Sequence, residues 1–364
     1  MGIDGFFVID KPYGPTSHQV DSWVRDILNE KKVGHVGTLD PNATGVLVMA
    51  IGKAVKLIDI VHEMPKEYVA TMRFHSDIPE ETVRAKMKEF TGEIYQIPPI
   101  RSAVARSLRI RRIYSIDNIE VAGRVVLFKV KCESGTYIRS LCTDLGYACG
   151  TTGQMLDLRR TQTGNFTEEQ AITLQDLADY FYLSRNGKPE LLQKHFISME
   201  TFFSKYPKII VKSSAIENIS HGSDLFPGGI KAITGNPARG DRVCVIDENN
   251  SIVATGIMLV NASDIDILKV VDFDRILIDP IASRKDAVEP EPKGDVVRPG
   301  KRSQEISVQR AKVKLRGDIR KTPEGRDSRD RDRRNERLTG PKRDAPKFRP
   351  GKNKRRPYRG SSSR

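Results

Sequence analysis

The stretch KKVGHVGTLDPNATGVLVMAIG, residues 31–52, predicts both a central strand and the turn that precedes it. Asp40 lies between Leu39 and Pro41 in a turn flanked by glycines. Because Pro41 favours an extended backbone at the residue before it, the Asp40 carboxylate is held out from a turn and not wound into a helix. The run GVLVMA, 45–50, is short and apolar, which is typical of a buried strand. An Asp before a Pro is most often only a turn former, so the surrounding chain has to decide its role.

Length and composition favour an intracellular protein of more than one domain. The chain has 364 residues, enough for two domains and a tail. Its four cysteines form no C-x-x-C pair and its six histidines form no H-x-x-x-H or Cys/His cluster, so we expect reduced cysteines and no metal site. The N-terminus does not have the pattern of a signal peptide, and no apolar run reaches 18 residues. We therefore expect a cytoplasmic protein with no membrane partner.

The net charge of +14 is concentrated in the last part of the chain. Residues 281–364 hold 28 Lys and Arg against 12 Asp and Glu, which leaves 33 basic and 35 acidic side chains in the other 280 residues. Few apolar residues remain in this tail, so we expect it to be disordered. Its charge indicates either non-specific, salt-dependent affinity for RNA or a solubilising role. The rest of the chain must bind any RNA through local patches.

Apolar spacing predicts the elements on either side of the Asp40 turn. Thr16 and Gln19 fit a capping box, followed by a helix whose buried face would carry Val20, Trp23, Val24, Ile27 and Leu28. A second helix beginning near Tyr137 would have Arg139 in its first turn, where a cation gains nothing from the helix dipole and more often answers a nearby anion. From 204 to 280 short strands and Gly/Asn/Pro turns predict a small all-β module.

Residues 94–113 combine two prolines with a run of arginines. Alternation from Ala103 to Ile113 predicts a strand with one basic face. The strand is either a solvated edge or a track for RNA phosphates, because the arginine fork matches phosphate oxygens.

Three pieces far apart in the sequence carry a family resemblance. GHVGTLDPNATGVL (34–47), KEY (66–68) and SGTYIRSL (134–141) with a following LRRT (158–161) resemble, in order and content, the TruB family of RNA pseudouridine synthases. The likeness covers roughly residues 5–280. It is strongest to the archaeal and eukaryotic branch, the dyskerin-like catalytic subunit of H/ACA ribonucleoproteins.

This resemblance implies a role for each matching residue. Asp40 would be the catalytic aspartate, Arg139 its ion-pair partner, and Tyr68 the aromatic residue that stacks on the flipped uracil and takes part in catalysis. Substrate-binding roles would fall to His35 in the motif loop, to Leu158 as an apolar wall of the base pocket, and to Lys11 in a supporting motif near the N-terminus.

The resemblance also implies a fold. The catalytic domain, 1–203, would be α+β, with a mixed, largely antiparallel sheet and flanking helices. Residues 204–280 resemble a PUA domain, an RNA-binding β-barrel, because HGS (221–223) and FPGG (226–229) match its glycine-rich loop. The chain departs from the archaeal pattern by entering the catalytic domain almost at once and by carrying the basic tail, 281–364.

The implied reaction moves ribose from N1 to C5 of uracil without redox change, so a carboxylate suffices, as nucleophile or base, with no cofactor. A neighbouring guanidinium would favour the ionised carboxylate. The expected substrates are uridine-55 in the TΨC loop of tRNA and rRNA sites selected by an H/ACA guide RNA. Expected partners in the second case are Nop- and Gar-type proteins and a kink-turn-binding ribosomal protein.

Two other functions compete with this one. A non-catalytic RNA-binding scaffold would not need a carboxylate matched with a guanidinium. A hydrolase with an aspartate nucleophile would need a second acid–base or metal site, and the sequence offers none.

Overall fold

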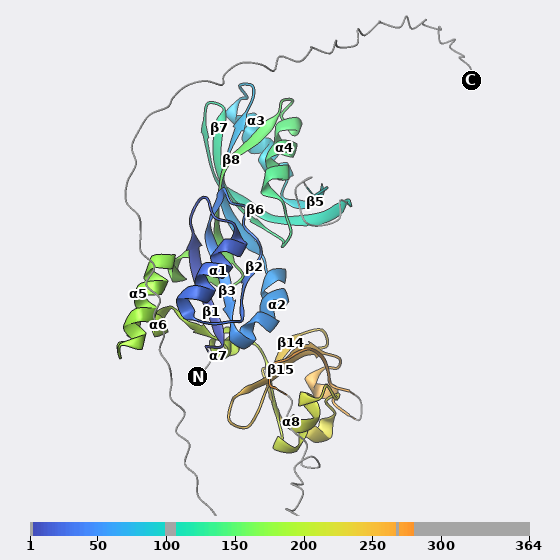
Figure 1. Ribbon diagram of the computed structural model, residues 1–364. Coiled ribbons are helices and arrows are strands. Elements are labelled where there is room, and N and C mark those ends of the chain that lie inside the picture. Colours follow the sequence, from blue (N-terminus) through green and yellow to red (C-terminus); the bar gives the residue numbers. More distant parts are fainter. Residues whose placement is uncertain (1–2, 99–106, 267–268, 280–364) are drawn as a thin grey trace, which may run out of the picture. The chain divides into compact units, whose positions relative to one another are not determined.

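The computed structural model describes residues 3–98, 107–266 and 269–279, and the predicted disordered tail lies outside these ranges (Figure 1). Within them, a first sheet follows the order β10-β1-β3-β8-β4-β7-β6-β5, with β11 on β1, β2 on β3 and β9 on β8. Only β1–β10 and β3–β8 pair in parallel among these strands. The predicted mixed, largely antiparallel sheet is therefore confirmed. The strands are β1 (Gly5–Lys11), β2 (Val33–Val36), β3 (Ala43–Ile51), β4 (Lys66–Phe74), β5 (Gly92–Gln96), β6 (Arg109–Ala122), β7 (Val125–Cys132), β8 (Gly153–Thr163), β9 (Phe166–Thr167), β10 (Ala171–Ile172) and β11 (Ile197–Ser198).

Helices flank this sheet, as predicted. Alternate side chains of β3 enter two different cores, because successive residues of a strand face opposite sides of the sheet. Val46, Val48 and Ala50 lie in one core, and Leu47, Met49 and Ile51 in the other. Burial on both faces explains why this strand reads as a continuous apolar run. The flanking helices are α1 (Ser17–Leu28), α2 (Ile58–Glu63), α3 (Glu80–Glu89), α4 (Ile138–Ala148), α5 (Leu174–Arg185), α6 (Glu190–His195) and α7 (Met199–Phe202).

Helix α1 begins at the predicted capping box, and its buried face differs from the predicted one at Trp23 and Asp21. Both halves of the box are present, since Gln19 N donates to Thr16 Oγ1 and Thr16 N to Gln19 Oε1. Val20, Val24 and Leu28 are buried as expected. Trp23, however, is 43% exposed, so its predicted place in the core is wrong. The polar Asp21 takes a buried position instead, at 5% exposure, because it follows Ser17 by four residues on the same side of the helix.

The second sheet belongs to the C-terminal module and has the order β13-β12-β14-β15-β16. Asn250, with φ 63°, lies in the tight β14–β15 connection, where the sequence predicts a hairpin. One helix, α8 (Ser213–Ser220), also belongs to this module and was not predicted by its turn-rich sequence. The strands are β12 (Lys208–Val211), β13 (Ile230–Thr234), β14 (Arg242–Ile246), β15 (Ile252–Met258) and β16 (Val271–Ile276).

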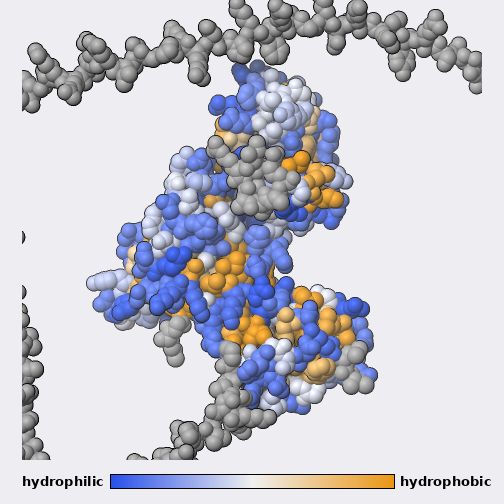
Figure 2. Space-filling view, turned by 45° about the vertical axis from the view of Figure 1, so that its right-hand side comes forward, coloured by the Kyte–Doolittle hydropathy of each residue, from blue (hydrophilic) through white to orange (hydrophobic). Residues whose placement is uncertain are grey.

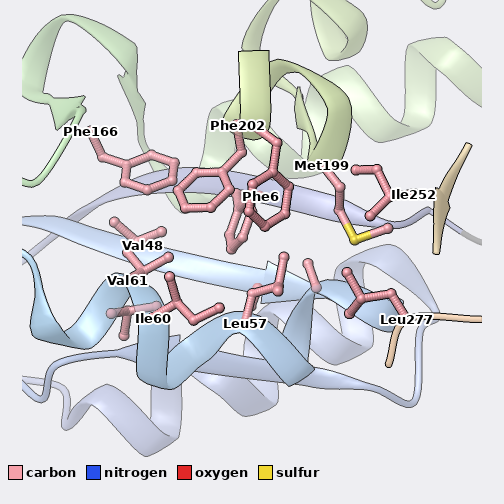
Figure 3. Close-up of a cluster of buried hydrophobic side chains, with 14 of the residues drawn as sticks. Phe6, Val48, Leu57, Ile60, Val61, Phe166, Met199, Phe202, Ile252 and Leu277 are labelled. Carbon is pink, nitrogen blue, oxygen red and sulfur yellow. The ribbon is translucent and has the colours of Figure 1, made fainter. Parts of the chain in front are cut away.

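The two modules share one hydrophobic core (Figure 3). Ile252 and Leu277 of the second module pack with Phe6, Met199 and other buried side chains of the first. Polar contacts border this core, where Lys56 Nζ donates to the Ile276 carbonyl at 2.9 Å and Arg275 pairs with Asp59. No helix among the described residues is long and apolar enough to cross a membrane.

Candidate active site

The Asp40 turn joins β2 to β3 and is held at several backbone positions. Ser17 at the start of α1 donates from Oγ to the Leu39 carbonyl at 3.0 Å and accepts from Leu39 N at 2.9 Å. The Asp40 carbonyl accepts from Ala43 N at 3.0 Å, and Gly14 N donates to the Pro41 carbonyl at 2.8 Å. These contacts fix the backbone on both sides of Asp40, and its side chain stays 57% exposed.

Lys11 lies beneath the same turn and is fully buried. Its ammonium donates to the carbonyls of Pro12, Pro41 and Ala43 at 3.0, 3.2 and 2.9 Å. Burial lowers the pKa of Lys11, and the negative charge of Asp40 opposes that effect. Since all three ammonium hydrogens serve backbone carbonyls, Lys11 supports the turn, and it is not part of the pocket lining. The substrate-binding role expected for Lys11 stays a prediction.

Asp40 and Arg139 meet although they are 99 residues apart. Arg139 Nη2 donates to Asp40 Oδ2 at 2.5 Å. Arg139 is the second residue of α4, whose N-cap is Tyr137, as the sequence predicts. Both side chains remain about half exposed, at 50% for Arg139 and 57% for Asp40. The pair is thus accessible at the mouth of a pocket and is not sealed in a dry interior.

Strand β8 brings the separate motifs together, because it pairs with both β3 and β4. Leu158 of β8 is in register with Ala43 on one side and with Ala70 on the other. The next positions set Tyr68 of β4 against Arg160 of β8. The strand that follows Asp40 and the strand that carries Tyr68 are therefore both neighbours of β8 in one sheet. A pocket of about 440 Å³ forms where they meet.

The pocket walls combine a carboxylate, an aromatic ring, cations and apolar side chains. Among the expected site residues it takes in Asp40, Tyr68, Arg139 and Leu158. Its size and mixed lining fit a small, flat, polar ligand with an apolar face. Further lining residues include Leu39, Ala43, His62, Lys66, Ser134, Ile138, Met155 and Arg160.

Two buried cations at the back of the pocket were not expected from the sequence. Arg160 is 1% exposed and donates to the carbonyls of Val46 and Gly37 at 2.7 and 2.9 Å. Lys66 is 4% exposed and donates to Met64 O at 2.7 Å, to Ser134 Oγ at 3.0 Å and to the His62 carbonyl. Both residues belong to the family motifs KEY and LRRT, so the motifs are the feature of the sequence that could have identified them.

Burial shifts the acid–base behaviour of this inner wall. It lowers the pKa of Lys66 to about 8, with the charge of Arg160 acting in the same direction. It also raises the pKa of the Tyr68 hydroxyl, while Arg160 opposes that shift. A raised pKa keeps Tyr68 neutral near pH 7, so the ring is better suited to stacking on a base than to acting as a phenolate.

His35 lies beside the Asp40 turn and is not part of the pocket lining. Its side chain is only 8% exposed. Nδ1 is 2.8 Å from Asp21 Oδ2, and Nε2 is 3.1 Å from Thr38 Oγ1. Both ring nitrogens are therefore engaged within the protein, and the structure does not place His35 where it could touch a ligand of the pocket.

The predicted arginine-rich strand is β6, although Arg101 and Arg106 lie outside the described residues. Arg111 lies against Gly135, which is a residue of the pocket lining, and pairs with Glu133 at 3.6 Å. Its neighbours Leu108 and Ile110 are exposed, at 63% and 50%, and Figure 2 shows apolar surface beside the grey segment in this region. Because successive side chains of a strand alternate between its two faces, the exposed Ile110 lies on the opposite face from Arg109 and Arg111.

Comparison with family models covers most of the described chain. Residues 25–138 match the N-terminal domain of TruB family pseudouridylate synthase, and residues 139–204 match the C-terminal domain of tRNA pseudouridylate synthase B. Residues 207–277 match the PUA domain.

Curated proteins and solved structures agree with these matches. The chain is 57% identical to a probable tRNA pseudouridine synthase B of Thermoplasma volcanium, over 90% of this chain and 89% of that protein. For the corresponding protein of Thermoplasma acidophilum the identity is 54%, over 98% and 93%.

Among solved structures, the Cbf5 chain of a Cbf5–Nop10–Gar1 complex matches with a TM-score of 0.69 and 42% identity, over 76% of this chain and 85% of that one. An H/ACA ribonucleoprotein bound to a substrate RNA containing 2′-deoxyuridine matches with a TM-score of 0.67 and 40% identity, over 76% and 86%. With its motifs gathered around one pocket and its relatives matched over most of their length, the chain belongs to the TruB family of RNA pseudouridine synthases.

Proposed function

We propose that this pseudouridine synthase uses Asp40 as its reacting carboxylate, on uridine-55 of tRNA and on guide-selected uridines of rRNA. The observation that carries the proposal is the 2.5 Å contact between Asp40 and Arg139 at the mouth of a pocket that also contains Tyr68. The guanidinium holds the carboxylate through a charge-assisted hydrogen bond, which orients it for a role as nucleophile or base.

The isomerisation needs no other reactant. The N1–C1′ bond breaks, C1′ bonds to C5, the hydrogen on C5 leaves as a proton, and N1 gains one. A target uridine must first leave its stack, at a cost of a few kcal/mol that is partly offset by stacking on an aromatic side chain. Tyr68, one of two tyrosines in the pocket lining, would provide this contact, with Leu158 as the apolar wall. Arg139 would hold the Asp40 side chain in position.

Two kinds of relative support the two substrate modes. Curated relatives are named as probable tRNA pseudouridine synthases, and the matched solved structures are Cbf5 with Nop10 and Gar1 and an H/ACA particle with substrate RNA. The proposed partners are accordingly Nop- and Gar-type proteins, a kink-turn-binding ribosomal protein and a guide RNA. Modules 1–203 and 204–280 would act together on the RNA.

A cytoplasmic location fits the cysteine chemistry. All four cysteines lie in the described ranges and are free thiols. Burial raises the pKa of Cys132, Cys142 and Cys244 to about 12, so these thiols are unreactive. Unpaired, buried thiols are typical of a reducing compartment.

The test is release of tritium from RNA labelled at uridine C5, with wild type compared against Asp40→Ala. Release from a tRNA transcript by wild type alone, lost in the variant, would support the tRNA mode. Release from a guided target only with guide RNA and partner proteins would support the H/ACA mode. The absence of release in every mixture, with RNA still bound, would contradict the proposal and favour an RNA-binding scaffold.

A further inference from the structure

Three potential metal ligands converge on the side of α1 that faces β2. His18 and Asp21 lie three residues apart on the helix, and His35 projects from β2. His18 Nδ1 is 3.4 Å and His35 Nδ1 is 2.8 Å from the same oxygen, Asp21 Oδ2. One ligand atom from each of the three residues lies within 4.8 Å of the other two. The cluster lies beside the pocket, and none of its members lines it.

Asp21 is an unusual residue for the buried face of a helix. Its side chain is 6% exposed, and its second oxygen, Oδ1, has no hydrogen-bond partner among the described residues. A buried carboxylate oxygen without a donor costs free energy, so such an atom calls for an explanation. A cation bound by this carboxylate would offset the cost of burying it.

His35 already has the arrangement of a metal-binding histidine. Such a histidine coordinates through one ring nitrogen and donates the N–H of the other to a nearby oxygen, which fixes the ring. His35 Nε2 lies 3.1 Å from Thr38 Oγ1, so with the proton on Nε2 the other nitrogen, Nδ1, can exchange its present contact with Asp21 Oδ2 for coordination of an ion that both atoms share. His18 Nδ1 approaches the same point from a side chain that is 83% exposed, which leaves one side open to water.

We propose that His18, Asp21 and His35 bind a divalent ion of the zinc class, with water as the fourth ligand. Two ligand atoms on one tetrahedral zinc ion lie about 3.3 Å apart, since each is about 2.0–2.1 Å from the metal. The 3.4 Å between His18 Nδ1 and Asp21 Oδ2 already fits, and the 2.8 Å from His35 Nδ1 has to lengthen by about half an ångström. Two imidazoles and one carboxylate suit zinc better than Mg²⁺ or Ca²⁺.

The site departs from the expectation that the chain binds no metal. That expectation came from the absence of a short histidine spacing, whereas the fold supplies the third ligand from 14 residues beyond Asp21. An ion bound here would connect α1 to Thr38, two residues before Asp40. It would add a third link to the two that Ser17 makes with Leu39, and so stiffen the catalytic turn.

In the experiment, Co²⁺ is titrated into the metal-free full-length protein, and binding is measured by the visible d–d absorption of the ion. Zn²⁺ is then added as a competitor. We expect one ion per chain in wild type. His18→Ala should raise the Kd for Co²⁺ at least tenfold, and its exposed side chain makes an effect on folding small. Thr38→Val should raise the Kd about tenfold through loss of the contact to Nε2. The matched control is His75→Ala, an exposed histidine outside the cluster, which should leave the Kd unchanged.

Failure of the metal-site proposal can be told apart from failure of the proposed catalytic function, because the absorption of bound Co²⁺ does not depend on RNA. Weak binding with no d–d absorption in wild type would overturn the proposal. So would a Kd that is the same in wild type and His18→Ala, because the ion would then be held elsewhere. Melting of the metal-free variants at the wild-type temperature excludes misfolding as the cause of lost binding.

Discussion

The cations around the pocket fall into two groups that differ in how their hydrogen bonds are used. Lys11, Lys66 and Arg160 are at most 4% exposed and donate largely to backbone carbonyls. Arg139 is 50% exposed, and its guanidinium contacts the Asp40 carboxylate. The buried cations therefore hold the shape of the site, while the exposed pair is available for chemistry. Substitutions in the first group should affect stability, and substitutions in the second should affect turnover alone.

The largest effect is expected for Asp40→Asn. The amide keeps the size of the side chain but is neither a nucleophile nor a base, so tritium release should fall at least about 10³-fold. Because the side chain is 57% exposed, the melting temperature should stay within about 2 °C of wild type. The control is Asp26→Asn, an exposed aspartate of α1 outside the pocket, which should retain full activity. Substantial release by Asp40→Asn would assign the chemistry to another group.

Arg139→Lys should have the next largest effect. A lysine keeps the charge but loses the planar fork, so Asp40 is held less precisely and turnover should fall about 10²-fold. Affinity for RNA, measured by filter binding, should stay within about threefold of wild type, as should stability. Unchanged turnover would show that the ion pair has no part in catalysis. A fall in RNA affinity equal to the fall in turnover would make Arg139 a binding residue instead.

Lys11→Met tests the group of buried cations. Three backbone carbonyls would each lose one hydrogen-bond donor, so the free energy of unfolding in urea should fall by about 2 kcal/mol. Turnover should fall with it, because the Asp40 turn loses its support. Lys31→Met, at an exposed position, is the matched control and should change neither quantity. Wild-type stability with reduced turnover would return Lys11 to the substrate-binding role that the sequence indicated.

The smallest effect concerns pH and Lys66. Its pKa is lowered by burial to about 8 from 10.5, so between these values the unfolded chain binds more protons than the folded one. The contribution of Lys66 to stability therefore rises with pH in this window. The difference in unfolding free energy between wild type and Lys66→Met should move in favour of wild type by about 1 kcal/mol from pH 8 to pH 9. A difference that is constant with pH would show that Lys66 does not titrate there.

The contrast between buried and exposed charged residues also shows what could be predicted from the sequence. Asp40, Tyr68, Arg139 and Leu158 were identified because whole motifs resembled a family, and the structure brings all four to one pocket. Helix starts at Thr16 and near Tyr137 followed from local chemistry and are confirmed. Local patterns succeed where neighbours in sequence supply the partners.

Residues whose partners are distant in sequence were missed or misjudged. The backbone acceptors of Arg160 come from positions 114 and 123 residues away, and no spacing rule reports them. Trp23 and Asp21 illustrate a second difficulty. Hydropathy placed the tryptophan inside and gave no reason to bury an aspartate, whereas the helix phase that buries Val20 and Val24 also buries Asp21. Tertiary contacts decided both positions.

The apolar core shared by the two modules has a consequence for how the protein unfolds. Side chains such as Ile252 and Leu277 on one side and Phe6 and Met199 on the other belong to a single cluster. Separating the modules would expose these surfaces to water, so neither can melt without destabilising the other. Residues 3–279 should behave as one cooperative unit with a single heat-absorption peak in calorimetry. A truncation after residue 203 would expose apolar side chains to water and would favour aggregation, so variants are best made in the full chain.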